Sequence, residues 1–206
     1  MMQFSRRITA LVMFGAAIMS TPLGAQSGAP TQSAVFAAGC FWCVESDFEK
    51  VPGVVEVISG YSGGRTPKPT YETASADGHI EVVKVIYDPS KVSYAQLLDF
   101  YWRHVDLVDG DGQFCDRGNT YRPAIFVDGP EQERAAEASK SALTASKRFS
   151  KPIAVTIEKA APFVPAEDYH QDYYKKNSIK YKLYRYGCGR DARLEALWGK
   201  DAAAGH

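Results

Sequence analysis

The sequence predicts an α+β fold, a two-layer α/β sandwich in which a mixed sheet of about five strands is covered by helices. Three observations predict it. Short β-branched and apolar stretches recur along the chain and are typical of strands. Stretches whose apolar residues recur every three or four positions lie between them and indicate helices. The chain has 206 residues, 45% of them hydrophobic, which is enough to bury one good core. The sequence has no internal repeat.

The individual elements follow in chain order. We expect strands over residues 34–38, 54–59, 79–87, 123–127 and 153–158, and helices over residues 41–51, 94–105, 130–149, 166–176 and 191–200. Pro52-Gly53 ends the first helix, a capping box from Ser93 to Gln96 begins the second, and Pro130 suits the first turn of the third. Two long loops follow, of which 65–73 contains two prolines and 106–122 contains four aspartates and three glycines. Long loops inside a compact domain are often functional. Together these elements predict a ferredoxin-like α/β roll with a long irregular C-terminal segment.

The N-terminal region has the pattern of a secretory signal peptide. Arg6-Arg7 precedes a short apolar run, residues 8–19, and Ala25 provides a cleavage site. We therefore expect a signal peptide over 1–25, a linker over 26–33, one domain over 34–200 and a tail over 201–206, with the mature protein in the periplasm or secreted. The alternative is an uncleaved segment that anchors the chain to the membrane, although the apolar run is short for a span. A partial twin-arginine pattern leaves the export route, Sec or Tat, open.

Charge and cysteine content exclude several classes of function. The 24 basic and 24 acidic residues give a net charge of zero, so we expect no nucleic-acid partner and no membrane association of the mature domain. The four cysteines, Cys40, Cys43, Cys115 and Cys188, can form two bridges in three connectivities that the sequence does not distinguish. One CxxC without a second pair does not predict zinc, and the Asp-Gly-Asp-Gly stretch at 109–112 lacks the glutamate that closes a calcium loop. We expect no metal.

Cys40 is the strongest candidate for a nucleophile. It follows Gly39 at a strand-to-helix turn, so it lies at the N-terminus of the first predicted helix, with Cys43 about one turn further. The backbone N–H groups and the helix dipole stabilise an anion there, which predicts a lowered thiol pKa. The alternative is a pair of buried structural thiols, or a disulfide that acts only as a covalent link.

Glu81 is a candidate acid. The period-2 phase of the strand over 79–87 places it on the same side as Val83, Val85 and Tyr87. A carboxyl group on an apolar face has a raised pKa and can remain protonated near neutral pH. The alternative is a glutamate near a strand end that reaches solvent or pairs with a lysine or arginine.

Seven motifs in order resemble one family, the peptide methionine sulfoxide reductases A. They are Gly-Cys-Phe-Trp at 39–42, Gly-Tyr-Ser-Gly-Gly at 60–64, Pro-Thr-Tyr at 69–71, Gly-His-Ile-Glu at 78–81, Tyr-Asp-Pro at 87–89, Asp-Arg-Gly-Asn-Thr-Tyr-Arg at 116–122 and Ala-Glu-Asp-Tyr-His-Gln-Asp-Tyr at 166–173. The resemblance runs from about residue 34 to residue 198. It is closest to the subtype whose first motif continues to a second cysteine, Gly-Cys-Phe-Trp-Cys.

The resemblance implies reduction of methionine S-sulfoxide, free or in proteins, to methionine. This is repair of oxidised protein under oxidative stress. It needs no cofactor, uses an external thioredoxin-type reductant, and is expected of a monomer. The matching motifs also imply a role for each residue. Cys40 resembles the family's nucleophile, Glu81 resembles its acid, and Tyr71 and Tyr121 resemble the hydroxyl donors to the sulfoxide oxygen. Asp116 resembles a polar residue of the pocket, and Phe41 and Trp42 resemble its apolar wall.

The family chemistry leaves Cys40 as a sulfenic acid, which a second thiol must convert to a disulfide. We favour Cys43, three residues away, because the loop that it closes is short. Cys188 lies between two glycines where other members carry a recycling cysteine, so it is the alternative resolving residue or a relay. Cys115 is interpreted as structural.

Two other classes of protein remain as alternative interpretations of the sequence. One is a thioredoxin-like thiol–disulfide oxidoreductase built on Cys40 and Cys43, which gives Glu81 and the tyrosines no role. The other is a secreted binding domain held by two disulfides. A cysteine hydrolase would need a base, for which His79 and His170 are the candidates, but no local signature supports either pairing.

Overall fold

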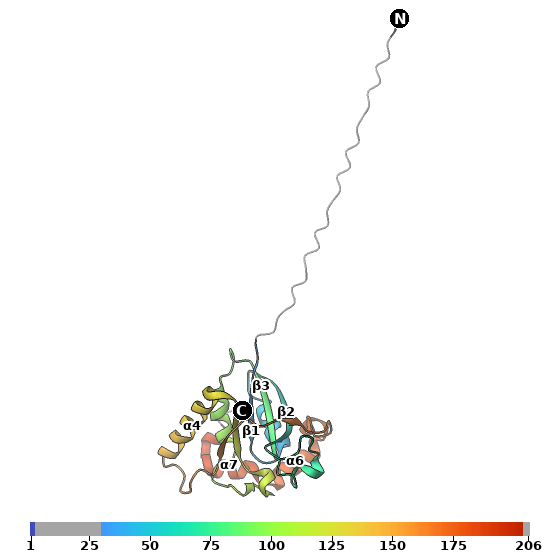
Figure 1. Cartoon of the computed structure of the whole chain (residues 1–206). Coiled ribbons are helices and arrows are strands. Elements are labelled where there is room, and N and C mark those ends of the chain that lie inside the picture. The colour runs from blue at the N-terminus through green and yellow to red at the C-terminus, as the bar shows by residue number, and fades with distance from the viewer. Residues whose placement is uncertain (3–29, 204–206) are drawn as a thin grey trace.

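A computed structural model describes residues 1–2 and 30–203 of the chain (Figure 1). Its centre is a six-stranded mixed sheet with the strand order β7-β6-β1-β3-β2-β8. The strands are β1 (Gln32–Ala37), β2 (Val54–Ser62), β3 (Ile80–Tyr87), β6 (Ala124–Val127), β7 (Thr156–Lys159) and β8 (Val164–Pro165). β6 and β7 are parallel, and the other neighbours are antiparallel. Nearly all of the expected signal peptide, part of the linker and the last residues of the tail lie outside the described residues.

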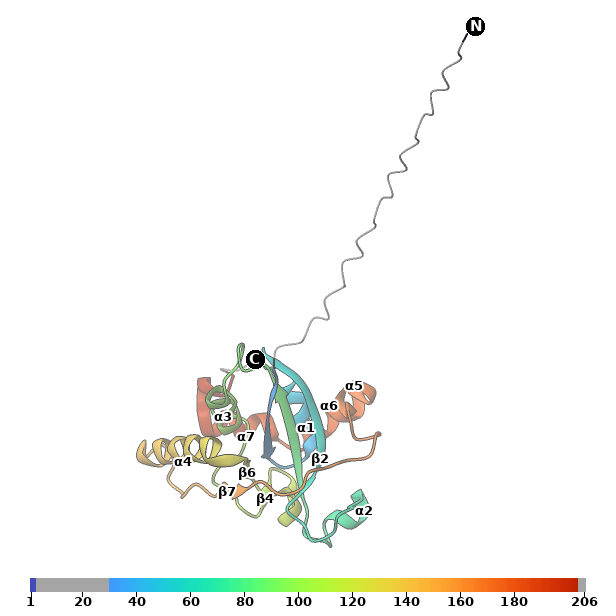
Figure 2. The ribbon, with the colours of Figure 1, turned by 45° about the horizontal axis from the view of Figure 1, so that its top comes forward.

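Helices flank this sheet and short elements fill its loops. The helices are α1 (Phe41–Phe48), α2 (Tyr71–Ala74), α3 (Tyr94–Arg103), α4 (Gly129–Ala145), α5 (Tyr173–Lys176), α6 (Ser178–Gly187) and α7 (Arg190–Trp198), with the 3-10 turns η1 (Asn119–Tyr121) and η2 (Gly199–Ala203). The loop over 106–122 contains a hairpin of β4 (Gly112–Gln113) and β5 (Asp116–Arg117). Figure 2 shows α3 and α4 at one side of the sheet and α5 and α6 at the other, beyond β2. In the described part of the chain, no helix is long and apolar enough to cross a membrane.

The core lies mainly on one face of the sheet. Phe36 of β1 stacks on Phe48 of α1 at 5.0 Å between ring centroids, and on Tyr101 of α3 at 5.2 Å. The opposite face has a smaller cluster around Val82 and Phe126, covered by Phe163 and its neighbours. Burial of these large aromatic rings, together with the aliphatic side chains around them, stabilises the fold. The expected two-layer α+β arrangement is therefore confirmed.

Most expected elements are present, with differences near the C-terminus. The capping box is confirmed, because the Ser93 hydroxyl accepts from the Gln96 N–H at 3.3 Å and the Gln96 side chain accepts from the Ser93 N–H at 2.9 Å. The prediction of a helix over 166–176 was wrong for residues 166–172, because the helix begins only at residue 173. There the Gln171 side chain bonds to both backbone groups of Ser59, and Asp172 has a φ of 54°, so the chain follows β2 instead.

The C-terminal segment is helical, which corrects the expectation of an irregular one. α6 and α7 cover residues 178–198, and their packing on α1 overrides a sequence rich in tyrosine and glycine. Arg190, Leu194 and Trp198 of α7 are buried. The two helices meet at Cys188-Gly189, where Gly189 has a φ of 68° and caps α7.

Candidate active site

Cys40 is the N-cap of α1, at the turn that joins β1 to this helix. Its carbonyl accepts hydrogen bonds from the N–H groups of Cys43 at 3.1 Å and Val44 at 3.3 Å. Gly39 before it has a φ of 84°, and a Cβ there would lie 2.6 Å from the Gln113 Cβ, so only glycine fits the turn. The predicted placement of Cys40 at a helix N-terminus is confirmed.

The two thiols of the CxxC stretch are free and buried, and they share a hydrogen bond. Cys40 is 7% exposed and Cys43 is 2% exposed. Burial raises the pKa of Cys40, and its hydrogen bond with Cys43 and the charge of Glu81 raise it further. That same hydrogen bond lowers the pKa of Cys43. The expected lowering of the Cys40 pKa was therefore wrong for the resting site, because loss of water around the thiolate outweighs the helix N-terminus.

Glu81 of β3 lies next to this turn. It is 3% exposed, and its Oε2 accepts a hydrogen bond from the backbone N–H of Phe41 at 2.9 Å. Burial raises its pKa to about 8, opposed by the Phe41 N–H. The predicted raised pKa is confirmed, since the carboxyl is held inside the protein and bonded to backbone rather than to a lysine or arginine. Much of Glu81 is therefore protonated at neutral pH.

The two predicted hydroxyl donors, Tyr71 and Tyr121, line one cavity with Glu81. A hollow of about 210 Å³ is bordered by Glu81, Tyr71 and Tyr121, together with Tyr61, Ala74, Ser75 and Thr120. Tyr71 begins α2 and Tyr121 ends η1, and their hydroxyls are hydrogen-bonded to each other. Burial and the charge of Glu81 raise the pKa of both, so both stay protonated and can donate. The structure thus brings together three of the predicted site residues.

Asp116 is joined to Cys40 through Tyr184 of α6. The Tyr184 hydroxyl donates to Asp116 Oδ2 at 2.5 Å and is also in hydrogen-bond contact with the Cys40 sulfur. Burial raises the pKa of Asp116, and the bond from Tyr184 opposes this. The sequence analysis missed Tyr184. The aromatic run over 181–186 was visible, but nothing in it showed which ring would face Cys40.

Phe41 and Trp42 belong to an aromatic cluster around the site. The Trp42 ring stacks on Tyr173 with centroids 3.7 Å apart, and its Nε1 donates to His170 Nδ1 at 2.9 Å. The Phe41 ring is buried against His170, 4.9 Å away. His170 is thus engaged with tryptophan rather than with a cysteine, which disfavours the hydrolase hypothesis. His79 bonds through its ring to Gly64 and Thr66 instead.

Glu167 is a second residue that the sequence analysis did not single out. Its two carboxylate oxygens accept from the Tyr71 N–H at 2.9 Å and from the Tyr61 hydroxyl at 3.0 Å. It therefore links the segment after β8 to two of the three cavity tyrosines, Tyr61 of β2 and Tyr71 at the start of α2. The family motif over 166–173 contained it, but its partners are more than 90 residues away in sequence.

Cys188 and Cys115 form a disulfide across 73 residues. Cys188 caps the C-terminus of α6, and Cys115 belongs to the loop between β4 and β5. The Cys188 sulfur is 3.8 Å from Asp116 Oδ2. Among the three connectivities left open, the structure has this one bridge and leaves Cys40 and Cys43 reduced.

Two groups have the composition of a metal site in the described residues. In one, Cys115, Asp116 and Cys188, both sulfurs are used by the disulfide. In the other, Glu45, Glu49 and Asp172, the Glu45 carboxylate accepts from the Ser59 hydroxyl and the Asp172 N–H, and Lys175 pairs with Glu49 and Asp172. Each of the three carboxylates in this second group therefore already has a protein donor as its partner.

Comparison with known proteins connects this geometry to one group of enzymes. The profile of the family described as "Peptide methionine sulfoxide reductase" matches residues 32–202. The protein "Peptide methionine sulfoxide reductase MsrA 2" of Rhizobium meliloti (strain 1021) is 50% identical over 194 residues, which are 94% of this chain and 97% of that protein. Two solved structures are similar. One is methionine sulfoxide reductase A of Corynebacterium diphtheriae, with 32% identity, a TM-score of 0.61, and 72% of this chain and 76% of that one covered. The other is reduced Mxr1 of Saccharomyces cerevisiae, with 27% identity, a TM-score of 0.67, and 72% and 86% covered.

Proposed function

This chain belongs to the peptide methionine sulfoxide reductase family and reduces methionine sulfoxide to methionine, and we propose that Cys40 attacks the sulfur of the S epimer while Glu81 protonates the oxygen. One observation carries this assignment. The Phe41 N–H holds the Glu81 carboxyl at 2.9 Å, so the acid is bonded to the peptide that directly follows the nucleophile. Thiol–disulfide exchange at Cys40 and Cys43 would give the cavity between Glu81, Tyr71 and Tyr121 no role.

The first step forms one bond and breaks another. The Cys40 thiolate attacks the sulfoxide sulfur, and Glu81 gives its proton to the oxygen, which is otherwise a poor leaving group. The protonated S–O bond then breaks, a water molecule adds its oxygen to the Cys40 sulfur, and the bond between the two sulfurs breaks, so that methionine leaves and Cys40 becomes a sulfenic acid. The sulfoxide sulfur is reduced by two electrons and the Cys40 sulfur is oxidised by two. The pKa of about 8 lets Glu81 hold its proton at neutral pH and release it during the reaction.

The cavity beside Glu81 supplies the binding contacts. The hydroxyls of Tyr71 and Tyr121 donate to the sulfoxide oxygen from the positions that they already share across the cavity. Trp42 is fixed by Tyr173 and His170, so it provides a rigid apolar surface for the methyl group, with Phe41 behind it. The Tyr184 hydroxyl, bonded to Asp116, contacts the Cys40 sulfur and helps to hold it.

Cys43 then converts the sulfenic acid to a disulfide. Its thiol is hydrogen-bonded to Cys40, so it is placed to attack, releasing water and leaving a Cys40–Cys43 bond. A thioredoxin-type dithiol protein returns both sulfurs to thiols from outside, and no prosthetic group takes part.

The place of action follows from the N-terminal pattern. We propose that residues 1–25 direct export, so that the enzyme repairs methionine in the periplasm or outside the cell. The exposed Cys115–Cys188 bond supports an oxidising compartment. N-terminal sequencing of the protein recovered from the periplasm tests this, since an intact Met1 in a membrane fraction would indicate the anchored alternative.

The reaction is tested with separated S and R epimers of a methionine sulfoxide peptide and dithiothreitol. The wild-type protein should reduce the S epimer alone, and Cys40→Ser should be inactive while it keeps the wild-type circular dichroism. Reduction of insulin disulfides without reduction of either epimer would show that the CxxC pair serves thiol–disulfide exchange instead. Equal turnover of both epimers would contradict the assigned pocket.

A further inference from the structure

We propose that Tyr169, Glu72 and Glu167 form a cation subsite beside the sulfoxide cavity, which takes the lysine or arginine side chain of a polypeptide substrate close to its methionine sulfoxide. This inference rests on the proposed function, because the subsite has a use only if the neighbouring cavity holds the sulfoxide. It adds a specificity: among oxidised methionines, the enzyme selects those with a basic neighbour.

Two exposed tyrosine rings share one buried histidine next to the cavity. Tyr71, which lines the cavity, is 44% exposed, and Tyr169 is 57% exposed. The centroid of the His170 ring lies 4.7 Å from that of Tyr71 and 4.1 Å from that of Tyr169. His170 therefore connects Tyr169 to one wall of the cavity, and more than half of the Tyr169 surface stays open to solvent. An open tyrosine face attracts the side chain of a lysine or arginine.

Two carboxylates act on the same tyrosine. Glu167 precedes Tyr169 by two residues, and Glu72 lies in the first turn of α2, directly after Tyr71. Partial burial and then the charges of Glu167 and Glu72 raise the pKa of Tyr169. Both carboxylates therefore lie within electrostatic reach of its hydroxyl, on the side of the molecule that carries the cavity.

The Glu167 carboxylate is ionised, and the histidine beside it does not neutralise it. Burial opposes ionisation, but the hydrogen bonds from the Tyr71 N–H and the Tyr61 hydroxyl lower the pKa of Glu167. Nε2 of His170 lies 3.9 Å from Glu167 Oε2 and has no hydrogen-bond partner. His170 is neutral, because its Nδ1 accepts from Trp42 and burial lowers the histidine pKa.

Neither carboxylate has a basic side chain as its counter-ion. In the described part of the chain, Glu72 and Glu167 form no ion pair with a lysine or arginine. Other carboxylates on this surface do have such a partner, as Asp109 has in Arg117. The negative charge beside Tyr169 is therefore available to a cation that arrives with the substrate.

An aromatic face with two unpaired carboxylates has the chemistry that binds an ammonium or a guanidinium group. The sulfoxide group itself has no net charge, so the subsite acts on a neighbouring residue of the substrate. A glutamate or aspartate in that position is repelled by the same charges. The contact is made equally before and during the reaction, so we expect it to change KM rather than kcat.

The test uses the wild-type protein, dithiothreitol and blocked peptides with one methionine S-sulfoxide. Lysine, glutamine or glutamate is placed in turn at each of the two positions on either side of it. At the favoured position the lysine peptide should exceed the glutamate peptide in kcat/KM by about tenfold, because an exposed charge pair changes binding by up to roughly fivefold in either direction. KM should account for the difference, and added salt should reduce it. Equal kcat/KM at every position, or a preference for glutamate, would overturn the subsite.

Variants locate the preference on the molecule. The ratio of kcat/KM between the lysine and glutamate peptides should fall to about threefold or less in Glu72→Gln and in Tyr169→Leu, since each removes part of the attraction. Glu133→Gln, on the exposed part of α4, is the matched control and should keep the wild-type ratio. Figure 2 shows α4 and α2 at opposite sides of the molecule.

The ratio is taken within one protein, so a general loss of activity or stability does not change it. A ratio that stays near the wild-type value in both Glu72→Gln and Tyr169→Leu would overturn the subsite and leave the proposed function intact. If the wild type reduces none of the peptides, including the one with glutamine, the proposed function itself fails.

Discussion

The backbone N–H of Phe41 donates a 2.9 Å hydrogen bond to Oε2 of Glu81. The residue after the nucleophile therefore holds the acid, and the spacing between the two reacting groups is set by the first peptide of α1 rather than by two independent side chains. This arrangement explains why Gly39, Cys40 and Phe41 are needed as consecutive residues at one turn.

Replacement of the acid tests its chemical part. Glu81→Gln keeps the size of the side chain and the acceptor for the Phe41 N–H, but it has no carboxyl proton to give. We expect kcat/KM for the S-sulfoxide peptide to fall by about 10²- to 10⁴-fold, the usual contribution of a positioned proton donor. Glu56→Gln, on the exposed part of β2, is the matched control and should keep wild-type activity. A drop of less than threefold in Glu81→Gln would contradict the role.

The value of kcat/KM should depend on pH in a defined direction. The reactive form needs the Cys40 thiolate and protonated Glu81. Burial raises both pKa values, that of Glu81 to about 8. Below pH 8 the thiolate fraction increases with pH, so kcat/KM rises; above it, each further gain in thiolate is offset by loss of the Glu81 proton.

A plateau in kcat/KM should therefore begin near pH 8. The slower Glu81→Gln variant has no such proton, and its kcat/KM should continue to rise through the same range. Identical pH profiles for the wild type and Glu81→Gln would show that Glu81 does not cause the plateau.

Tyr184 should tune the nucleophile. Burial raises the pKa of Cys40 and the contact with Tyr184 opposes this, so Tyr184→Phe should raise that pKa further. We expect the rate of Cys40 alkylation by iodoacetamide at pH 8, with the other thiols mapped separately, to fall by roughly tenfold, as for loss of a hydrogen bond to a charged group. Tyr186→Phe on the same helix is the control, because Tyr186 is 87% exposed. An unchanged alkylation rate in Tyr184→Phe would show that the hydroxyl does not act on the sulfur.

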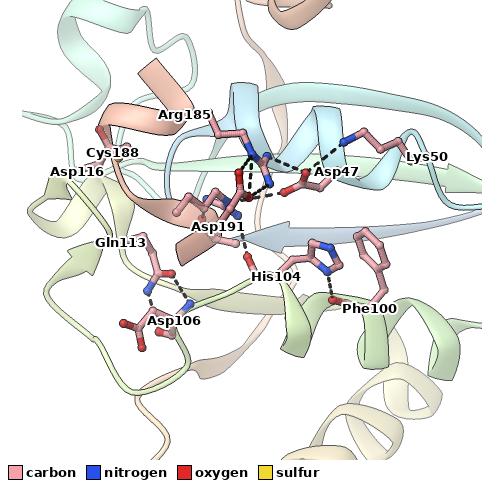
Figure 3. Close-up of polar contacts among 12 residues, drawn as sticks. Asp47, Lys50, Phe100, His104, Asp106, Gln113, Asp116, Arg185, Cys188 and Asp191 are labelled. Atoms are coloured by element: carbon pink, nitrogen blue, oxygen red, sulfur yellow. Dashed lines mark hydrogen bonds and ion pairs between the residues drawn. The ribbon is translucent and has the colours of Figure 1, made fainter. Parts of the chain in front are cut away.

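Asp47 should anchor the C-terminal helices. It is 1% exposed, and it faces Arg185 of α6 at 2.7 Å and Arg190 of α7 at 3.6 Å, as Figure 3 shows for Arg185. Asp47→Asn removes the charge but leaves the buried guanidinium groups, which should lower the free energy of unfolding in urea by about 3 kcal/mol.

The exposed pair of Arg148 and Asp201 provides the comparison for Asp47. Asp201→Asn should cost less than about 1 kcal/mol, because solvent screens this pair. Equal losses for the two variants would mean that the buried cluster does not anchor α6 and α7.

Local pattern predicted five of the six strands of the sheet, the first helix and the placement of Cys40 and Glu81, because these features depend on residues within a few positions of one another; the short β8 was missed. The direction of the Cys40 pKa was wrong, since it depends on burial by β3 and α6, which are distant in sequence. The Cys115–Cys188 bond joins residues 73 apart and was one of several equal choices. Tyr184 was hidden among neighbouring tyrosines, and only the packing of α6 on α1 selects it.

The most direct test of the mechanism is to trap the first intermediate. Cys43→Ser, isolated with the Cys115–Cys188 bond intact, has no thiol to resolve Cys40. It is treated with the S-sulfoxide peptide and dimedone, which reacts with sulfenic acids. The account predicts about one methionine per chain and one dimedone adduct, located on Cys40 by mass spectrometry. Methionine release with Cys40 unmodified would contradict nucleophilic attack by Cys40.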